Sequence, residues 1–295
     1  MKFRSILDES MAPTMHSAYE NAYSGGRRPQ MSGCGMRVAI GLAIAAFALF
    51  SYFGSTSSET NNFTGRNQRL KLNPQEEIQL GLASRQKMAA MHGGLSKDVQ
   101  AREFVNRVGQ KLVRDTDADE TAYKFEFHLL ADRNTVNAFA LPGGQIFITE
   151  ALFRLLKTED ELAGVLGHEI GHVVGRHSSE QIAKSELVGG LTTAFVVASS
   201  DGSSNTNAQL AQLVNQVVNT KYGRDDELES DRLGVKFLYE AGYNPEALIK
   251  VMEILKRASG GGGGPPEFLS THPSSENRIE QIKAEIAKIR ATGGQ

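Results

Sequence analysis

The strongest constraint on this chain is a pair of histidines, His168 and His172, that lie four residues apart in a predicted helix. Residues four apart on a helix share one face, so both imidazoles can reach a single metal ion. Glu169 is rotated by about 100° from His168 around the helix axis, close to such an ion without being its ligand. Thr158 and Glu161 form a capping box at the start of this helix. The spacing predicts that the helix binds one zinc ion per chain, with Glu169 as general base on a zinc-bound water.

A catalytic zinc site usually has three protein ligands and one open position. In metzincins a histidine six residues after the second one completes the set, but this chain has Ser178 at that place. His177 comes one residue early and, in a continuous helix, faces about 180° away from His168. We therefore interpret His177 as a structural or surface histidine and reject the metzincin pattern.

A carboxylate farther along the chain is the other candidate for the third ligand. Glu227 and Asp231 are again four residues apart on one predicted helical face. Glu227 can complete a site of two histidines and one glutamate. Asp231 can accept the second ring N–H of a ligand histidine, which would fix the orientation of that ring. The predicted metal ligands are thus His168, His172 and Glu227, with Asp231 behind them.

One uncharged apolar segment, residues 38–53, differs from the rest of the chain. Extended to 36–54, it is long enough for a helix that crosses a bilayer. We favour a retained membrane anchor, and the alternatives are a cleaved signal segment or a buried core helix. Arg27, Arg28 and Arg37 precede the segment closely, whereas the basic residues on its other side begin farther away. The positive-inside rule then favours a cytoplasmic N-terminus and an exported C-terminal body.

The remaining chain divides by composition and periodicity. Residues 1–35 are expected to be disordered and 55–72 to form a polar linker, and the folded domain is expected over 73–295. The predicted helices are 74–91, one capped by Ser96, 158–184, 208–241, 245–259 and 275–291, with strands at 124–130 and 145–149 and loops at 199–207 and 260–264. This order predicts an α+β fold, mostly helical with a small β-sheet, and its HExxH active-site helix indicates the zincin type.

Composition argues against several other classes of function. A formal net charge of −2 gives no reason to expect a nucleic-acid partner, which would normally need a basic patch. No phosphate-binding glycine loop follows a predicted strand. A protease with several membrane spans is also excluded, because residues 187–198 are too few to cross a bilayer. Cys34 is the only cysteine, so the chain forms no internal disulfide.

Four blocks of the sequence, taken in order, resemble the HtpX-like and CAAX-prenyl-endopeptidase-type gluzincin metalloproteases. They are residues 137–144, the HExxH at 168–172, the ExxxAD-like run at 227–231, and the Ser-Thr-His-Pro run at 270–273. The resemblance extends over about residues 73–290. Ser230 stands where that family usually has alanine, and Gly223 stands where serine is common, but both keep the position small.

The resemblance implies two further parts of the site. An edge strand against which a substrate polypeptide lies is expected at Gln145, Ile146, Phe147 and Ile148. His272 is expected near the active site, either as a catalytic residue that stabilises the oxyanion or as a group that occupies the open zinc position in a latent form. The alternative for His272 is a structural place beside the N-cap of the next helix.

Together these features predict a zinc-dependent endopeptidase that hydrolyses polypeptides. The resemblance implies misfolded or envelope proteins as substrates and a single-pass location in the cell inner membrane, with the catalytic domain on the periplasmic side. A catalytically latent or chaperone-like metal-binding protein of the same fold is the alternative. The sequence does not decide the oligomeric state.

Overall fold

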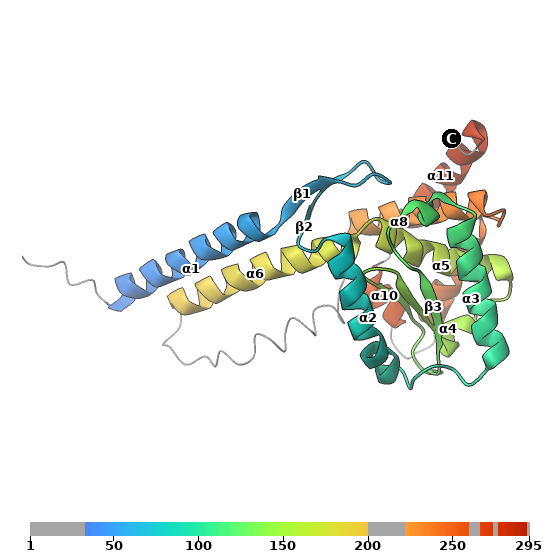
Figure 1. Ribbon diagram of the computed structural model, residues 1–295, viewed down its shortest axis with the longest axis horizontal. Coiled ribbons are helices and arrows are strands. Elements are labelled where there is room, and N and C mark those ends of the chain that lie inside the picture. The colour runs from blue at the N-terminus through green and yellow to red at the C-terminus, as the bar shows by residue number, and fades with distance from the viewer. Residues whose placement is uncertain (1–32, 200–221, 260–265, 274–276, 294–295) are drawn as a thin grey trace, which may run out of the picture.

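The computed structural model describes residues 33–199, 222–259, 266–273 and 277–293. Helices pack around a three-stranded sheet, and two long helices extend together from one side of this domain (Figure 1). The predicted α+β class, mostly helical with a small sheet, is confirmed. The expectations for residues 1–32, for a loop at 200–207, for a helix over 208–221 and for the glycine run at 260–264 lie outside the described residues.

The sheet consists of β3 (Glu126–Leu130), β4 (Ala138–Leu141) and β5 (Gln145–Thr149), in the order β3-β5-β4. The central strand, β5, pairs in parallel with β3 and antiparallel with β4. The prediction that Gln145, Ile146, Phe147 and Ile148 form an edge strand is therefore wrong, because hydrogen bonds occupy both sides of β5. All five β5 residues are buried. The two outer strands of this sheet are β3 and β4. The four residues of β4 are apolar and do not alternate with polar ones, so the sequence did not reveal this strand.

The first two helices of the domain are α2 (Pro74–Met91) and α3 (Val99–Arg114). The start of α2 is as predicted, since the Asn73 side chain accepts from Glu76 N and the Glu76 side chain accepts from Asn73 N. The predicted cap of α3 is wrong, because Asp98 caps this helix. Ser96 instead donates its hydroxyl to Glu150 at 2.6 Å.

The predicted continuous helix over 158–184 is also wrong. It is divided into α5 (Glu159–Val174) and α6 (His177–Ser199) by Arg176, whose φ of 57° is left-handed. The guanidinium of Arg176 explains how a non-glycine residue is held there. It donates to Glu77 at 3.1 Å, to Glu59 at 2.7 Å and to the Leu72 carbonyl at 2.7 Å. His177 consequently leaves the register of α5.

The remaining elements complete the domain around α5, which is buried along almost its whole length. They are the 3-10 turn η1 (Asp117–Glu120) and the helices α4 (Glu150–Phe153), α8 (Arg224–Glu240), α9 (Ala247–Ser259), α10 (Glu267–Thr271) and α11 (Arg278–Thr292). Helix α8 packs along α5, α9 also contacts α5, and α11 packs on α8. This arrangement puts the HExxH helix in the centre of the domain.

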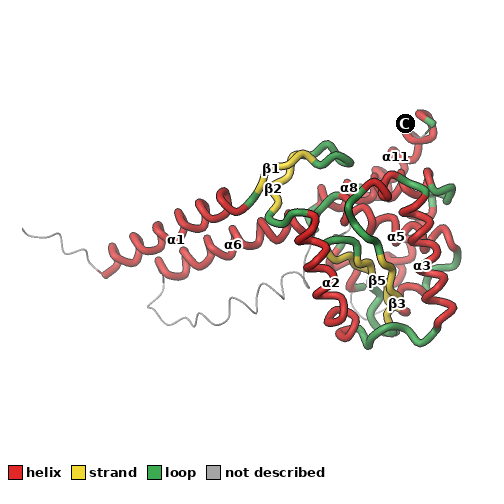
Figure 2. The backbone as a smooth tube through the Cα atoms, in the orientation of Figure 1, coloured by secondary structure: helices red, strands yellow, loops and turns green. Residues whose placement is uncertain are grey.

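The N-terminal part of the described chain is α1 (Gly33–Ser55), followed by a hairpin of β1 (Ser57–Thr60) and β2 (Asn67–Leu70). This hairpin lies within residues 55–72, which were expected to be a polar linker. Their polar side chains bind the free carbonyls at the end of α5: Asn61 Nδ2 donates to Val174 O at 2.9 Å, and Gln68 Nε2 donates to Gly175 O at 2.7 Å. Figure 2 shows the hairpin between α1 and the domain. The helix preceding it is thus fastened to the active-site helix.

Candidate metal centre

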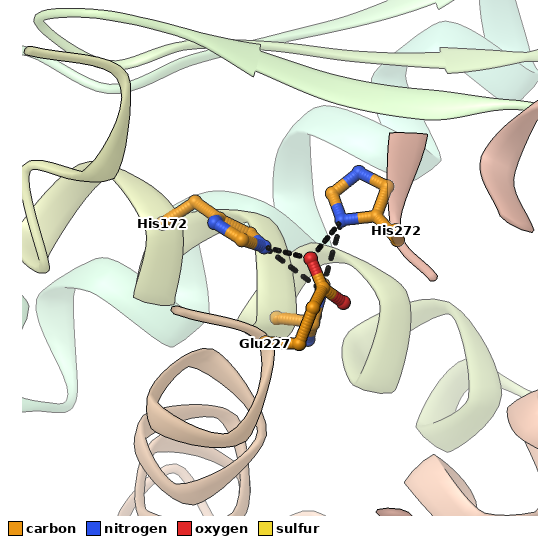
Figure 3. Close-up of side chains that lie close together, drawn as sticks. His172, Glu227 and His272 are labelled. Atoms are coloured by element: carbon orange, nitrogen blue, oxygen red, sulfur yellow. Dashed lines mark hydrogen bonds and ion pairs between the residues drawn. The ribbon is translucent and has the colours of Figure 1, made fainter. Parts of the chain in front are cut away.

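Four side chains from three helical segments converge in the interior of the domain. His168 and His172 come from α5, Glu227 comes from α8, and His272 lies at the C-terminal end of α10. One ligand atom from each lies within 4.8 Å of all the others, and all four residues are buried. Figure 3 shows His172, Glu227 and His272 pointing toward one another. The structure thus brings together the three predicted ligands and His272.

The distances within this cluster fit a shared metal ion. The Nε2 atoms of His168 and His172 are 3.1 Å apart, and Glu227 Oε1 lies 3.3 Å from His172 Nε2. His272 Nδ1 lies 3.0 Å from Glu227 Oε1 and 3.3 Å from His168 Nε2. Imidazole nitrogens and a carboxylate oxygen that face one point form a donor set that zinc prefers.

Asp231 lies behind the cluster, where it orients His168. Its Oδ1 atom is 2.9 Å from His168 Nδ1, which leaves Nε2 of that ring facing the other ligands. Burial disfavours the charged imidazole, but hydrogen bonds with Asp231 and Glu227 raise the pKa of His168 to about 9. This is the arrangement expected for Asp231 from the spacing.

Arg278, at the start of α11, was not identified from the sequence. It is buried and donates to Asp231 through two nitrogens, at 2.7 Å each, and its Nη1 atom is 2.8 Å from Glu227 Oε2. Burial opposes ionisation of Glu227, but the His272 charge and hydrogen bonds from the three histidines hold its pKa well below the usual range. Arg278 therefore connects two carboxylates of the site, and no local pattern around it points to this role.

A second supporting pair, His177 and Glu229, lies behind His172. His177 Nδ1 is 2.9 Å from His172 Nδ1, and His177 Nε2 is 2.8 Å from Glu229 Oε2. The Tyr222 ring stacks on His172, with 3.8 Å between ring centroids. His177 is structural, as interpreted, but the assumption of a continuous helix was wrong, and its contact with His172 follows from the break at Arg176. Gly175 was the only sequence signal for that break.

Glu169 is fully buried beside the cluster and has the environment of a proton acceptor. Both carboxylate oxygens have no hydrogen-bond partner among the described residues, and Oε1 lies 3.6 Å from His272 Nε2. Burial raises the pKa of Glu169. A buried carboxylate without partners is costly in a purely structural role, so this observation favours a group that binds a reactant at this point.

Small residues allow α5 and α8 to approach closely enough to share ligands. A Cβ at Gly171 would lie 2.9 Å from the carbonyl oxygen of Ser230, so only glycine fits there. Ser230 also donates its hydroxyl to the His168 carbonyl at 2.9 Å. The serine that replaces the family's alanine thus adds a hydrogen bond between the two ligand-bearing helices.

A surface cleft leads from the metal cluster along the edge strand β4. Its lining includes His272 and Tyr222, Phe139 and Leu141 of β4, and Met88 of α2. Phe139 stacks on Phe147 of the central strand, with 4.9 Å between centroids. The cleft therefore joins an unpaired strand edge to the candidate site within the described part of the chain.

Comparison with known proteins agrees with this geometry. Residues 100–286 match the model of Peptidase family M48. The mitochondrial metalloendopeptidase OMA1 of Schizosaccharomyces pombe is 35% identical over 181 residues, which cover 61% of this chain and 51% of that protein. The beta-barrel assembly-enhancing protease of Escherichia coli is 30% identical over 207 residues, covering 66% and 41%. The OMA1 protein of Saccharomyces cerevisiae is 32% identical over 199 residues, covering 64% and 56%.

The matched regions span about half the length of these relatives. The family match includes both histidines of the HExxH helix, Glu227, Asp231 and His272. These are the residues that the structure brings together from α5, α8 and α10. The chain belongs to Peptidase family M48.

Proposed function

We propose that this protein is a zinc-dependent endopeptidase in which His168, His172 and Glu227 hold the metal and Glu169 is the catalytic base. The observation that carries this proposal is the buried His-His-Glu cluster and, beside it, the Glu169 carboxylate, which has no hydrogen-bond partner among the described residues. Zinc held only for structure has no need for such a carboxylate, whereas hydrolysis at a zinc site needs a proton acceptor beside the metal. The chemistry of the site therefore favours hydrolysis over a purely structural metal.

Zinc bound here would polarise the substrate carbonyl and lower the pKa of water. The residues of the chain perform the remaining tasks. Glu169 takes a proton from the attacking water and passes it to the leaving amine. Asp231 holds the His168 ring in one orientation, while His177 and Glu229 hold that of His172.

A polypeptide substrate is proposed to bind along β4. The edge of β4 that does not pair with β5 borders the cleft to the cluster, so an extended peptide can add to the sheet there. Backbone hydrogen bonds of this kind depend little on sequence, which suits misfolded or envelope proteins as substrates. One relative is named for enhancing β-barrel assembly, which supports this choice.

The apolar helix α1 suggests membrane anchoring, and we propose a single-pass location in the cell inner membrane. The segment Gly35–Ser55 is long and apolar enough to cross a bilayer. Arg37 lies at its N-terminal end, and Arg69 lies beyond its other end, on the hairpin. Arginines placed close to the N-terminal end favour a cytoplasmic N-terminus, with the catalytic domain on the periplasmic side.

His272 is proposed to gate the site. It is fully buried, stacks on Phe268 with 4.4 Å between centroids, and lies among the ligand atoms. A fourth protein donor at this place occupies the position that a catalytic zinc keeps open for water or substrate. In this arrangement the enzyme is latent, and movement of His272 would open it.

The test is to measure zinc content and casein cleavage for the wild type, Glu169→Gln and His272→Ala. Glu169→Gln should keep one zinc per chain and lose cleavage by about 10²-fold or more, because the base is removed. Cleavage at the wild-type rate by Glu169→Gln would overturn the mechanism. If the wild type and His272→Ala both bind zinc and neither cleaves casein, the result would support the latent or chaperone-like alternative.

His272→Ala separates the two roles considered for His272. Removing a gate should raise the cleavage rate, whereas removing an oxyanion-stabilising group should lower it by about 10²-fold. Equal zinc affinity and equal rate in His272→Ala and the wild type would contradict both roles.

A further inference from the structure

Helices α1 and α6 extend side by side and antiparallel from the protease domain (Figures 1 and 2). Only 6% of the apolar window in α1 is buried within the protein. The last charged residue of α6 is Glu186, and residues 187–199 contain none. The distal part of α6 therefore shares the apolar character of the helix beside it.

The two helices are in close contact well inside the apolar part of α1. A Cβ built on Gly190 would lie 2.6 Å from the Cβ of Ala48, so the glycine lets the backbones approach. Ala48 is seven residues from Ser55, the end of α1 at the domain, which corresponds to about 10 Å along the helix. Small residues at such a contact are typical of helices that pack within lipid.

Charged and aromatic side chains lie where both helices join the domain. Lys71 forms an ion pair with Glu186 of α6. The Arg69 guanidinium lies 4.5 Å from the ring centroid of Phe53 and 5.6 Å from that of Tyr52, near the end of α1. Basic and aromatic residues at one level are characteristic of the boundary between a bilayer and water.

Beyond this boundary, apolar side chains on both helices point away from the protein. Val188 of α6 is 61% exposed and Leu191 is 38% exposed, and Phe50 of α1 is 77% exposed. The thirteen residues 187–199 correspond to about 20 Å of helix, which is less than the thickness of the hydrocarbon layer. The distal part of α6 is thus long enough to enter a bilayer but not to cross it.

We propose that residues 187–199 of α6 enter the bilayer beside α1, and that lipid acyl chains cover Val188 and Leu191. If α1 crosses the membrane, the contact between Gly190 and Ala48 places this part of α6 about 6 Å inside the same layer, counted from the level of Tyr52. This inference rests on the proposed anchoring by α1. Because α6 begins at His177, which contacts the metal ligand His172, the two-helix element also holds the active site at a set distance from the membrane surface.

The test uses the full-length protein in membranes, with single cysteines in a Cys34→Ser background that has no other thiol. The variants are Val188→Cys in α6, Phe50→Cys in α1 and, as an accessible control, Lys184→Cys, whose side chain is 46% exposed. Membrane-impermeant maleimide is applied to opened membranes before and after detergent. We expect Lys184→Cys to react at once, and Val188→Cys and Phe50→Cys to react only after detergent.

The outcomes separate this inference from the proposed anchor. Rapid reaction of Val188→Cys with protection of Phe50→Cys would overturn the insertion of α6 and leave the anchor intact. Rapid reaction of both would overturn the anchor as well.

Discussion

At the residue scale, the stability of the site depends on the buried cation Arg278. This guanidinium is the partner of Asp231 and Glu227, which are themselves buried. Removing one member of a buried charge network leaves the others uncompensated, at a cost of about 3–5 kcal/mol. We therefore expect Arg278→Met to lose about that much unfolding free energy, measured by chemical denaturation.

The matched control is Arg290→Met, in the same helix. Arg290 pairs with Glu246 at 3.1 Å, and both side chains are about half exposed. Exposed ion pairs contribute about 0–1 kcal/mol, so this variant should be close to wild type. An equal loss in both variants would contradict a special role for Arg278.

The raised pKa of His168 predicts how the affinity for zinc depends on pH. Its pKa is raised to about 9 by Asp231 and Glu227 against the effect of burial, so the metal-free protein carries a proton on this imidazole at neutral pH. Zinc binds only the neutral ring and must displace that proton. Between pH 7 and 9 the affinity of the metal-free protein for zinc should rise by about tenfold per pH unit and then level off.

Competition against a chelating dye at several pH values measures this dependence. The variant Asp231→Asn removes one carboxylate that favours the charged ring, so its affinity should level off at a lower pH. An affinity that does not change between pH 7 and 9 in the wild type would rule out the protonated imidazole.

At the element scale, the contact of α5 with α8 positions Glu227, the proposed third ligand. In Gly171→Ala the new methyl would lie within 3.1 Å of three Ser230 atoms, two of them backbone, and would push away the helix that carries Glu227. Overpacking of this kind costs about 1–3 kcal/mol. We expect Gly171→Ala to lose that much stability, seen in a lower melting temperature, and to bind zinc more weakly.

Gly167→Ala, one turn earlier, is the control for this variant. Its Cβ would meet Gly234 backbone atoms no closer than 3.6 Å, which is ordinary contact. Alanine is favoured over glycine within a helix by about 1 kcal/mol, so Gly167→Ala should be neutral or slightly stabilising. A similar loss of zinc affinity in both variants would mean that helix flexibility, and not close packing, is what the glycines provide.

At the scale of the whole molecule, the hairpin of β1 and β2 joins the apolar helix α1 to the active-site helix α5. The buried Gln68 donates to Gly175 O at 2.7 Å and to Glu180 at 3.2 Å. Gln68→Ala would remove the donor to the Gly175 carbonyl, at about 1–3 kcal/mol, while Glu180 keeps its ion pairs with Arg66 and Lys184. Hydrogen exchange should therefore show protected amides in the hairpin of the wild type and faster exchange in Gln68→Ala. Rapid hydrogen exchange at the hairpin amides of the wild type would instead show that the hairpin is not fixed to the end of α5.

The sequence by itself determined what depends on neighbours within one helix. The two histidines of α5, the acids of α8 and the caps at Asn73 and Thr158 follow from the 3.6-residue period and from the free N–H groups at helix starts. The third ligand and the orienting aspartate were predictable because they have the same spacing of four. The apolar segment was evident from its length and lack of charge.

Only the tertiary structure decided which separate segments meet. The central place of β5 depends on pairing with two strands, and short apolar strands do not encode that order. Arg278 reaches Asp231 across 47 positions, and the left-handed Arg176 that turns His177 toward His172 is held by Glu59, Glu77 and Leu72. Such contacts between distant residues depend on the packing of the whole domain, whereas spacing along one helix is a local property of the chain.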